Sequence, residues 1–301
     1  MKIAVIGIGG VGGIVTSALK AVEDELILVC RGETAKAIKE NGLIVRSDML
    51  GDRVVKPFLV SNDPKEIGIV DAAIICCKTY SLKNVIEMYK DIIGKETLVV
   101  PLQNGVTAAG EAEKQLDGRG YVADGYIYCF SNIEKPGVIV NSGDLLKIGI
   151  GFSDGRKDEK AEKLVKLLND GGLPSMYGGA EIKSALWEKY IMMCGCSCAF
   201  IYYDCATGEI QKDPEKLEFL RGIYSDLKRI ADHAGVKVNE KIVDNYMDIF
   251  MKNPPESISS LYRDIRNKKA DTEYDAIIGG GIRLAQKYGA DVPYMMKVYK
   301  K

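Results

Sequence analysis

Six residues near the N-terminus constrain the fold more than any other part of the sequence. They follow the apolar run KIAVI, open a helix expected over 11–22, and match the pattern G-x-G-x-x-G. In this setting the first glycine permits a tight turn, the second leaves room for a pyrophosphate, and the third lets the helix pack closely on the strand. The helix N-terminus then offers N–H groups to the phosphates. The pattern therefore predicts a dinucleotide site at Gly7, Ile8, Gly9, Gly10, Val11 and Gly12.

The first half of the chain alternates apolar runs with amphipathic stretches. Further strands are expected at 26–30, 71–77 and 97–101, and helices at 33–40 and 82–93. This rhythm is typical of a doubly wound parallel sheet. Strand-like segments at 121–130, 137–140 and 145–150 are expected to extend that sheet as antiparallel strands. A helix near 158–169 and a strand near 173–177 close this half.

Beyond the Gly178-Gly179 pair the pattern is almost wholly helical, with helices expected at 180–203, 214–234, 240–250 and 272–288. The sequence therefore predicts an α/β fold in two domains. We expect residues 1–179 to form a Rossmann-type, dinucleotide-binding domain and residues 180–301 to form an all-helical domain.

Composition narrows the class of protein. Lys and Arg (41) nearly balance Asp and Glu (42), so nothing points to nucleic acid or an anionic membrane as a partner. The chain begins with an expected strand, MKIAVIG, so we expect no secretory leader. The apolar stretch 185–203 contains Glu188 and Lys189, which favours a buried helix over a membrane span. We expect a cytoplasmic protein whose eight cysteines are reduced core residues, with no metal site. The one histidine, His233, lies in a charged helical stretch and is read as structural, so histidine-based catalysis is nearly excluded.

The end of the second strand should show which cofactor is bound. An acidic residue there accepts the ribose hydroxyls of NAD, whereas an arginine accommodates the 2′-phosphate of NADP. The strand LILVC ends in Arg31, whose guanidinium can hold a phosphate with two hydrogen bonds. Arg31 therefore predicts NADPH, although Glu33 could turn inward and accept the hydroxyls instead.

Two polar residues follow later strands of the expected sheet. Lys78 comes after the strand at 71–77 and Asn104 after the strand at 97–101. Ligands of open α/β sheets bind just beyond the carboxyl ends of strands, although a loop lysine and an Asn-Gly turn need no such role. Lys189 interrupts an otherwise apolar helix, where a lysine either reaches the surface or is held in a cleft. A held lysine would suit the negative charge that develops on a ketone oxygen during hydride addition.

The chain resembles the ketopantoate reductase family from end to end. The resemblance rests on MKIAVIGIGGVGG with Arg31 and, in order along the chain, on CCKTY at 76–80, LQNGV at 102–106, LWEKY at 186–190, SSLYRDI at 259–265 and TEYDAIIG at 272–279. It implies that residues 1–179 form an NADP-binding Rossmann domain and that residues 180–301 form a helical domain with the substrate and the catalytic groups. It also implies a cleft for nicotinamide and substrate. It further implies reduction of the 2-oxo group of ketopantoate by NADPH to give pantoate, a step of pantothenate biosynthesis.

The resemblance also implies roles for individual residues. Lys189 is the general acid, and Glu273 is the catalytic glutamate that orients the lysine or binds a substrate hydroxyl. Lys78 lines the cofactor, Asn104 lies between cofactor and substrate, and Ser260 helps to hold the substrate carboxylate. The family's T-E-x-D requires one extra residue in this chain, and a different gap would put Thr272 in the place of the glutamate.

Two positions depart from the family pattern. Asparagines usually follow the lysine four and eight residues later, where this chain has Met193 and Ser197. We expect both side chains to face the substrate, because such positions share one face of a helix. Three interpretations stay open: a ketopantoate reductase with a rearranged pocket, an NADPH-dependent reductase of another small 2-oxo acid or ketone, and a non-catalytic NADP(H)-binding regulatory protein. A homodimer is possible.

Overall fold

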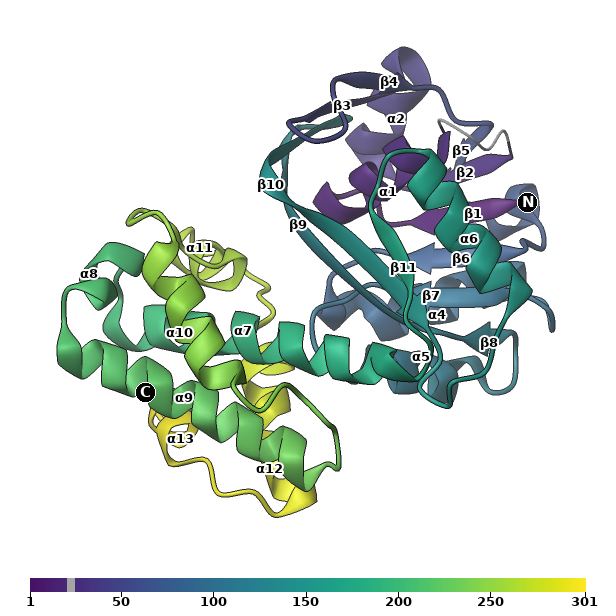
Figure 1. Ribbon diagram of the computed structural model, residues 1–301. Coiled ribbons are helices and arrows are strands. Elements are labelled where there is room, and N and C mark those ends of the chain that lie inside the picture. Colours follow the sequence, from purple (N-terminus) through teal and green to yellow (C-terminus); the bar gives the residue numbers. More distant parts are fainter. Residues whose placement is uncertain (21–24) are drawn as a thin grey trace. The chain divides into compact units, whose positions relative to one another are not determined.

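The computed structural model describes residues 1–20 and 25–301, which fall into two compact units (Figure 1). The first unit contains Met1–Gln103 and Thr107–Ile182, and the second contains Asn104–Val106 and Lys183–Lys301. The three residues Asn104–Val106 thus pack with the second unit, although they follow a strand of the first. The predicted end of the first helix, at Val22, lies outside the described residues.

The first unit is built on a six-stranded sheet in which every neighbouring pair is parallel. This confirms the predicted Rossmann-type sheet. Its apolar strands are continuous because both faces are buried. Ile3 and Val5 face one core cluster, and Ala4 and Ile6 face another. The order is β5-β2-β1-β6-β7-β8, with β1 (Ile3–Ile6), β2 (Leu26–Val29), β5 (Leu59–Ser61), β6 (Ala72–Ile75), β7 (Leu98–Pro101) and β8 (Tyr121–Val122).

Helices cover both faces of this sheet. The buried residues of α1 and α6 belong to the cluster on one face, and those of α3, α4 and α5 belong to the cluster on the other. The helices are α1 (Gly10–Lys20), α2 (Gly32–Asn41), α3 (Pro64–Ile67), α4 (Leu82–Tyr89), α5 (Ala108–Leu116) and α6 (Glu159–Asp170), with 3₁₀ turns at Thr79–Ser81, Lys90–Ile92 and Gly179–Glu181.

A second, five-stranded sheet corrects one prediction. The segments after residue 120 were expected to extend the first sheet as antiparallel strands, but only β8 extends it, and β8 is parallel to β7. The long antiparallel pair β9 (Asp124–Lys135) and β10 (Val138–Gly151) instead joins β3 (Leu43–Ser47), β4 (Arg53–Val55) and β11 (Ser175–Tyr177). The prediction was wrong because an apolar pattern indicates a strand but does not indicate which other strands it pairs with. Here α1 packs against strands of both sheets, and its partners in the second sheet include β9 and β10.

The second unit is helical, as predicted. Its elements are α7 (Ile182–Tyr203), α8 (Thr207–Gln211), α9 (Pro214–His233), α10 (Ile242–Lys252), α11 (Ser260–Arg266), a π-helical turn (Asp275–Gly279), α12 (Gly280–Tyr288) and α13 (Pro293–Tyr299). The sequence did not predict the short helices α8, α11 and α13. No helix in the described part of the chain is long and apolar enough to cross a membrane.

A buried carboxylate ties α13 to α9. Asp226 of α9 is almost fully buried, and its Oδ2 accepts hydrogen bonds from the backbone N–H groups of Tyr294 (2.7 Å) and Met295 (3.0 Å). Its Oδ1 accepts from Arg229 Nη1 at 3.0 Å. Because Tyr294 and Met295 stand in the first turn of α13, Asp226 satisfies N–H groups that the helix itself leaves open. Burial nevertheless raises the pKa of the Asp226 carboxyl above its usual value, although these donors oppose the rise.

We expect this carboxyl to make the stability of the second unit depend on pH. The folded state binds the Asp226 proton more tightly than the unfolded chain does, so the free energy of unfolding falls as pH rises from about 4 through the raised pKa. An Asp226→Asn variant cannot ionise. Its free energy of unfolding should therefore improve relative to the parent as pH rises through that window, as measured by denaturation followed through the fluorescence of the single tryptophan, Trp187.

An Asp226→Ala variant serves as the comparison. It removes the acceptor for two backbone N–H groups, so it should unfold about 1–3 kcal/mol more easily across the same pH range. A difference between Asp226→Asn and the parent that stays constant with pH would contradict the assignment of the titration to Asp226.

Candidate active site

The glycine-rich turn has the geometry that dinucleotide binding needs. Gly7 has φ +93°, and a Cβ on it would lie 2.9 Å from the backbone N of Cys77. A Cβ on Gly12 would lie 2.1 Å from the carbonyl oxygen of Gly7, so the third glycine is needed for packing. A Cβ on Gly9 would meet no heavy atom of the described residues within 4 Å. The turn therefore leaves open space at the position expected for a pyrophosphate, beside the first residue of α1.

This turn lies where the strand order reverses. The sheet runs from β1 to β2 and β5 on one side and to β6, β7 and β8 on the other, and the crevice at such a switch point is where open α/β sheets bind ligands. Backbone hydrogen bonds fix the loops there: Gly7 N donates to Val29 O at 3.0 Å, and Cys76 N donates to Ile6 O at 2.8 Å. The ends of β1, β2 and β6 are thereby held together.

Gln103 is a positioning residue that the sequence analysis missed. Its buried amide Nε2 donates to the carbonyl oxygens of Ile75 and Cys77, both at 3.0 Å. It therefore joins the end of β7 to the loop that precedes Lys78. The signal was present in the LQNGV motif, where a glutamine directly follows a buried strand.

The other predicted cofactor residues differ in exposure. Ile8 is buried and Val11 half-buried, so both help to pack the turn, while Gly10 lies against Ser131 of β9. Arg31 follows β2 as the N-cap residue of α2, and both Arg31 and Glu33 are exposed. Lys78 is exposed just beyond β6, at the N-cap of a 3₁₀ turn. Arg31 and Lys78 are thus positive groups that follow the strands on either side of β1.

Three of the predicted site residues come together within the helical unit. Lys189 on α7 is buried (8% exposed), and its Nζ donates a hydrogen bond to Asn104 Oδ1 at 2.9 Å. Asn104 Nδ2 faces Glu273 Oε2 at 3.5 Å, and the Glu273 side chain is also buried. The Lys189–Asn104–Glu273 cluster therefore joins segments separated by 85 and 169 residues in sequence.

The Asn104 amide is oriented by the two charges beside it. Its oxygen faces an ammonium and its nitrogen faces a carboxylate, and the reverse orientation would oppose donor to donor and acceptor to acceptor. A buried charge is costly unless it is paired and hydrogen-bonded. The cluster satisfies this condition with one cation, one anion and an amide between them.

Tyr190 positions the segment that contains Glu273. It follows Lys189 on α7, and its buried hydroxyl donates to Ile277 O, in the π-helical turn, at 2.6 Å. Burial raises the pKa of the Tyr190 phenol well above its usual value, so the group stays a donor at neutral pH. Ile277 N in turn donates to Glu273 O at 2.9 Å. Helix α7 thus holds Lys189 directly and the backbone of Glu273 through Tyr190.

Four further predicted residues lie outside the hydrogen bonds of the cluster. Ser197 is fully buried and donates to Met193 O of its own helix at 2.8 Å, and the Met193 side chain is half-buried. Ser260 is the first residue of α11, after its N-cap Ser259. Thr272 Oγ1 accepts a long hydrogen bond from Tyr274 N (3.4 Å). Of the two candidates for the glutamate position, the structure places Glu273, and not Thr272, beside Asn104.

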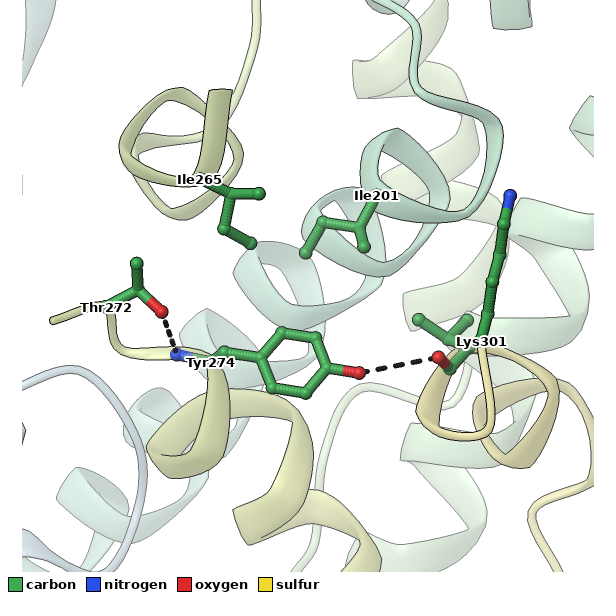
Figure 2. A pocket seen from close by; sticks show the side chains of 6 residues that line it. Ile201, Ile265, Thr272, Tyr274 and Lys301 are labelled. Carbon is green, nitrogen blue, oxygen red and sulfur yellow. Dashed lines mark hydrogen bonds between the residues drawn. The ribbon is translucent and has the colours of Figure 1, made fainter. Parts of the chain in front are cut away.

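An open pocket of about 420 Å³ lies in the helical unit (Figure 2). Thr272 and Tyr274, which flank Glu273 in the sequence, contribute to it, together with Ile201, Ile265, Val298 and Lys301. Ile201 lies twelve residues after Lys189, which corresponds to about 18 Å along a helix. Because a small acid bound at Lys189 would not span that distance, we do not assign the pocket to the cluster.

The thiols offer little nucleophilic chemistry. Burial raises the pKa of the Cys30 and Cys196 thiols to about 11, and it also raises that of Cys76. These groups stay protonated at neutral pH, and the thiolate is the reactive form. Among the described residues no group of three or more His, Cys, Asp or Glu side chains is arranged to hold a metal ion.

Two family models match this chain. The family model for ketopantoate reductase PanE/ApbA matches residues 3–155, and the model for its C-terminal part matches residues 181–301. The 2-dehydropantoate 2-reductase of Aquifex aeolicus is 24% identical over 97% of this chain and 93% of the relative.

Solved structures share the fold over the whole chain. The 2-dehydropantoate 2-reductase from Methylococcus capsulatus has a TM-score of 0.90 at 22% identity, covering 100% of this chain and 95% of that one. A D-mandelate dehydrogenase bound to NADH and anilino(oxo)acetate has a TM-score of 0.84 at 21% identity, covering 100% and 96%. Together the family models cover both units, and the chain belongs to the ketopantoate reductase family of oxidoreductases, which act on a keto/hydroxyl pair.

Proposed function

We propose that this protein catalyses the NADPH-dependent reduction of the 2-oxo group of ketopantoate, or of a closely related small 2-oxo acid, to the 2-hydroxy acid. The observation that carries this proposal is the buried ammonium of Lys189, held at 2.9 Å by Asn104. A cation withdrawn from water and fixed in position is suited to an oxygen that gains negative charge during the reaction.

The donor side of the proposal rests on the glycine turn and Arg31. The open space at Gly9 and the start of α1 at Gly10 fit a pyrophosphate. Arg31, exposed after β2, fits the 2′-phosphate that distinguishes NADPH from NADH. When bound, the reduced nicotinamide supplies a hydride to the carbonyl carbon.

The residues of this chain supply the proton and its positioning. We assign Lys189 as the general acid that delivers a proton from Nζ to the carbonyl oxygen as the hydride reaches the carbon. An ammonium has three N–H bonds, and Asn104 accepts one of them. Glu273 balances the buried positive charge through the Asn104 amide, which keeps Nζ in one place. Ser260 is the proposed contact for the substrate carboxylate.

The relatives support this class of reaction. One is named 2-dehydropantoate 2-reductase, and a structural neighbour is a D-mandelate dehydrogenase whose complex contains NADH and an oxo acid. Both names describe a 2-oxo/2-hydroxy pair, and the complex of the second protein also contains a nicotinamide cofactor. The cytoplasmic location and the homodimer stay predictions from the sequence.

Replacing Lys189 should remove turnover while NADPH still binds. Lys189→Met retains the apolar stem and deletes the acid, so we expect kcat for ketopantoate to fall at least about 100-fold. The fall in NADPH absorbance on addition of the acid gives the rate, and calorimetry gives the NADPH dissociation constant.

The matched control is Lys183→Met, an exposed lysine on the same helix. It should leave both quantities unchanged. If Lys189→Met still reduces ketopantoate at the parent rate, Lys189 is not the general acid. Tight NADPH binding by the parent protein without turnover of any oxo acid or ketone would instead indicate a non-catalytic binding protein.

Replacing Arg31 should separate the two possible cofactors. Arg31→Ala removes a charge-assisted contact to the 2′-phosphate, so the NADPH dissociation constant should rise about ten- to hundredfold while that for NADH changes little. Calorimetric titration with both cofactors measures this.

The neighbouring Glu33→Ala variant tests the alternative, in which Glu33 accepts ribose hydroxyls. We expect its NADPH affinity to match that of the parent. Equal losses of NADPH and NADH affinity in Arg31→Ala, or a selective loss of NADH affinity in Glu33→Ala, would refute the 2′-phosphate assignment.

A further inference from the structure

The surroundings of Lys189 on α7 are apolar. Residues four positions away on a helix lie on the same face, about 6 Å along its axis. For Lys189 these are Ala185 and Met193, and neither offers a strong hydrogen-bonding group. The polar side chains beside Lys189 in sequence have other partners: Glu188 Oε1 accepts from Asn239 N at 2.9 Å, and Tyr190 donates to Ile277 O.

The hydroxyl of Ser197 adds no hydrogen-bonding group to these apolar surroundings. It donates its hydrogen to Met193 O, one turn back on the same helix, and the whole residue has 0% exposure. Serine commonly makes this bond to the backbone four residues earlier. Since its donor is in use and its oxygen is buried, Ser197 offers nothing to a ligand. Of the two residues that follow Lys189 along this face, Met193 is the one that keeps an exposed part, while the rest of its side chain packs on the apolar core of the helical unit.

Met193 favours an apolar group over a hydroxyl. A thioether is flexible and polarizable, so it packs against hydrocarbon of varied shape, but it accepts hydrogen bonds only weakly. A substrate hydroxyl placed against it loses water without gaining a partner. Within the cluster, Lys189 Nζ donates to Asn104 Oδ1 and Asn104 Nδ2 faces Glu273 Oε2, and in the proposed reaction these groups serve the oxo group.

We infer that the acceptor is a 2-oxo acid with an apolar side chain, and that the 4-hydroxyl of ketopantoate is not recognised. This inference rests on the proposed function, since it concerns the acceptor of the same Lys189 site. Met193 is then the residue that determines side-chain specificity.

Two acids that differ by one oxygen test the inference. Trimethylpyruvate is ketopantoate with its hydroxymethyl group replaced by methyl. With the parent protein and saturating NADPH, we expect kcat/KM for trimethylpyruvate to equal or exceed that for ketopantoate, by up to about tenfold, because apolar sites reject an added hydroxyl only moderately. A higher kcat/KM for ketopantoate would overturn the inference and leave the proposed function standing.

Failure of the proposed function gives a different result. If neither acid is reduced, and phenylpyruvate and pyruvate are not reduced either, the proposed function and the inference both fail. Reduction of trimethylpyruvate or phenylpyruvate without reduction of ketopantoate supports the inference.

A pair of variants tests the role of Met193. Met193→Asn places a donor and an acceptor on this face, so the ratio of kcat/KM for ketopantoate to that for trimethylpyruvate should rise about tenfold. Met192→Asn introduces the same amide one residue earlier, rotated by about 100° around the helix. It should leave the ratio unchanged.

The two variants also identify the outcome that contradicts the assignment. If the ratio rises equally in both, or in neither while both variants retain NADPH binding, Met193 does not determine the side-chain specificity.

Discussion

The hydrogen bond from Lys189 to Asn104 is the contact on which the candidate active site depends. Without partners, a lysine ammonium and the Glu273 carboxylate would each lose several kcal/mol by leaving water. The Asn104 amide stabilises both buried charges because its oxygen faces the Lys189 ammonium and its nitrogen faces the Glu273 carboxylate. The arrangement also explains why Asn104–Val106 pack with the helical unit although the preceding strand belongs to the sheet.

Local patterns made the first unit largely predictable. The turn at Gly7–Gly12 needs a strand before it and a helix after it, and all three are contiguous in sequence. Strand pairing over long distances was not predictable in the same way. The segment at 124–151 has the composition of strands, but its assignment to a second sheet depends on α1 covering the first one and on pairing with Leu43–Ser47. Neither condition can be inferred from the sequence of residues 124–151 alone.

The candidate site was also predictable only in part. Lys189, Asn104 and Glu273 could be selected from motifs, and the structure brings them together. The motifs did not reveal that Gln103 fixes the loop before Lys78, or that Tyr190 fixes the turn after Glu273. Nor could they show the partner of the Ser197 hydroxyl, because a serine on a helix can face a ligand or bond to its own backbone with equal ease.

Helix α7 contains both Lys189, the proposed general acid, and Met193, the proposed specificity residue, at positions one turn apart. The partners that hold Lys189 come from other segments, namely the loop after β7 and the stretch before the π-helical turn. The side chain of Met193 takes no part in the hydrogen bonds of that cluster and lies one turn further along the helix. In the proposed reaction, a change at Met193 should therefore alter which acceptor side chains are accepted without disturbing Lys189, the proposed proton donor. On this proposal the fold and Lys189 define the reaction, whereas a single position on one helix face defines how much of the substrate beyond the oxo acid is recognised.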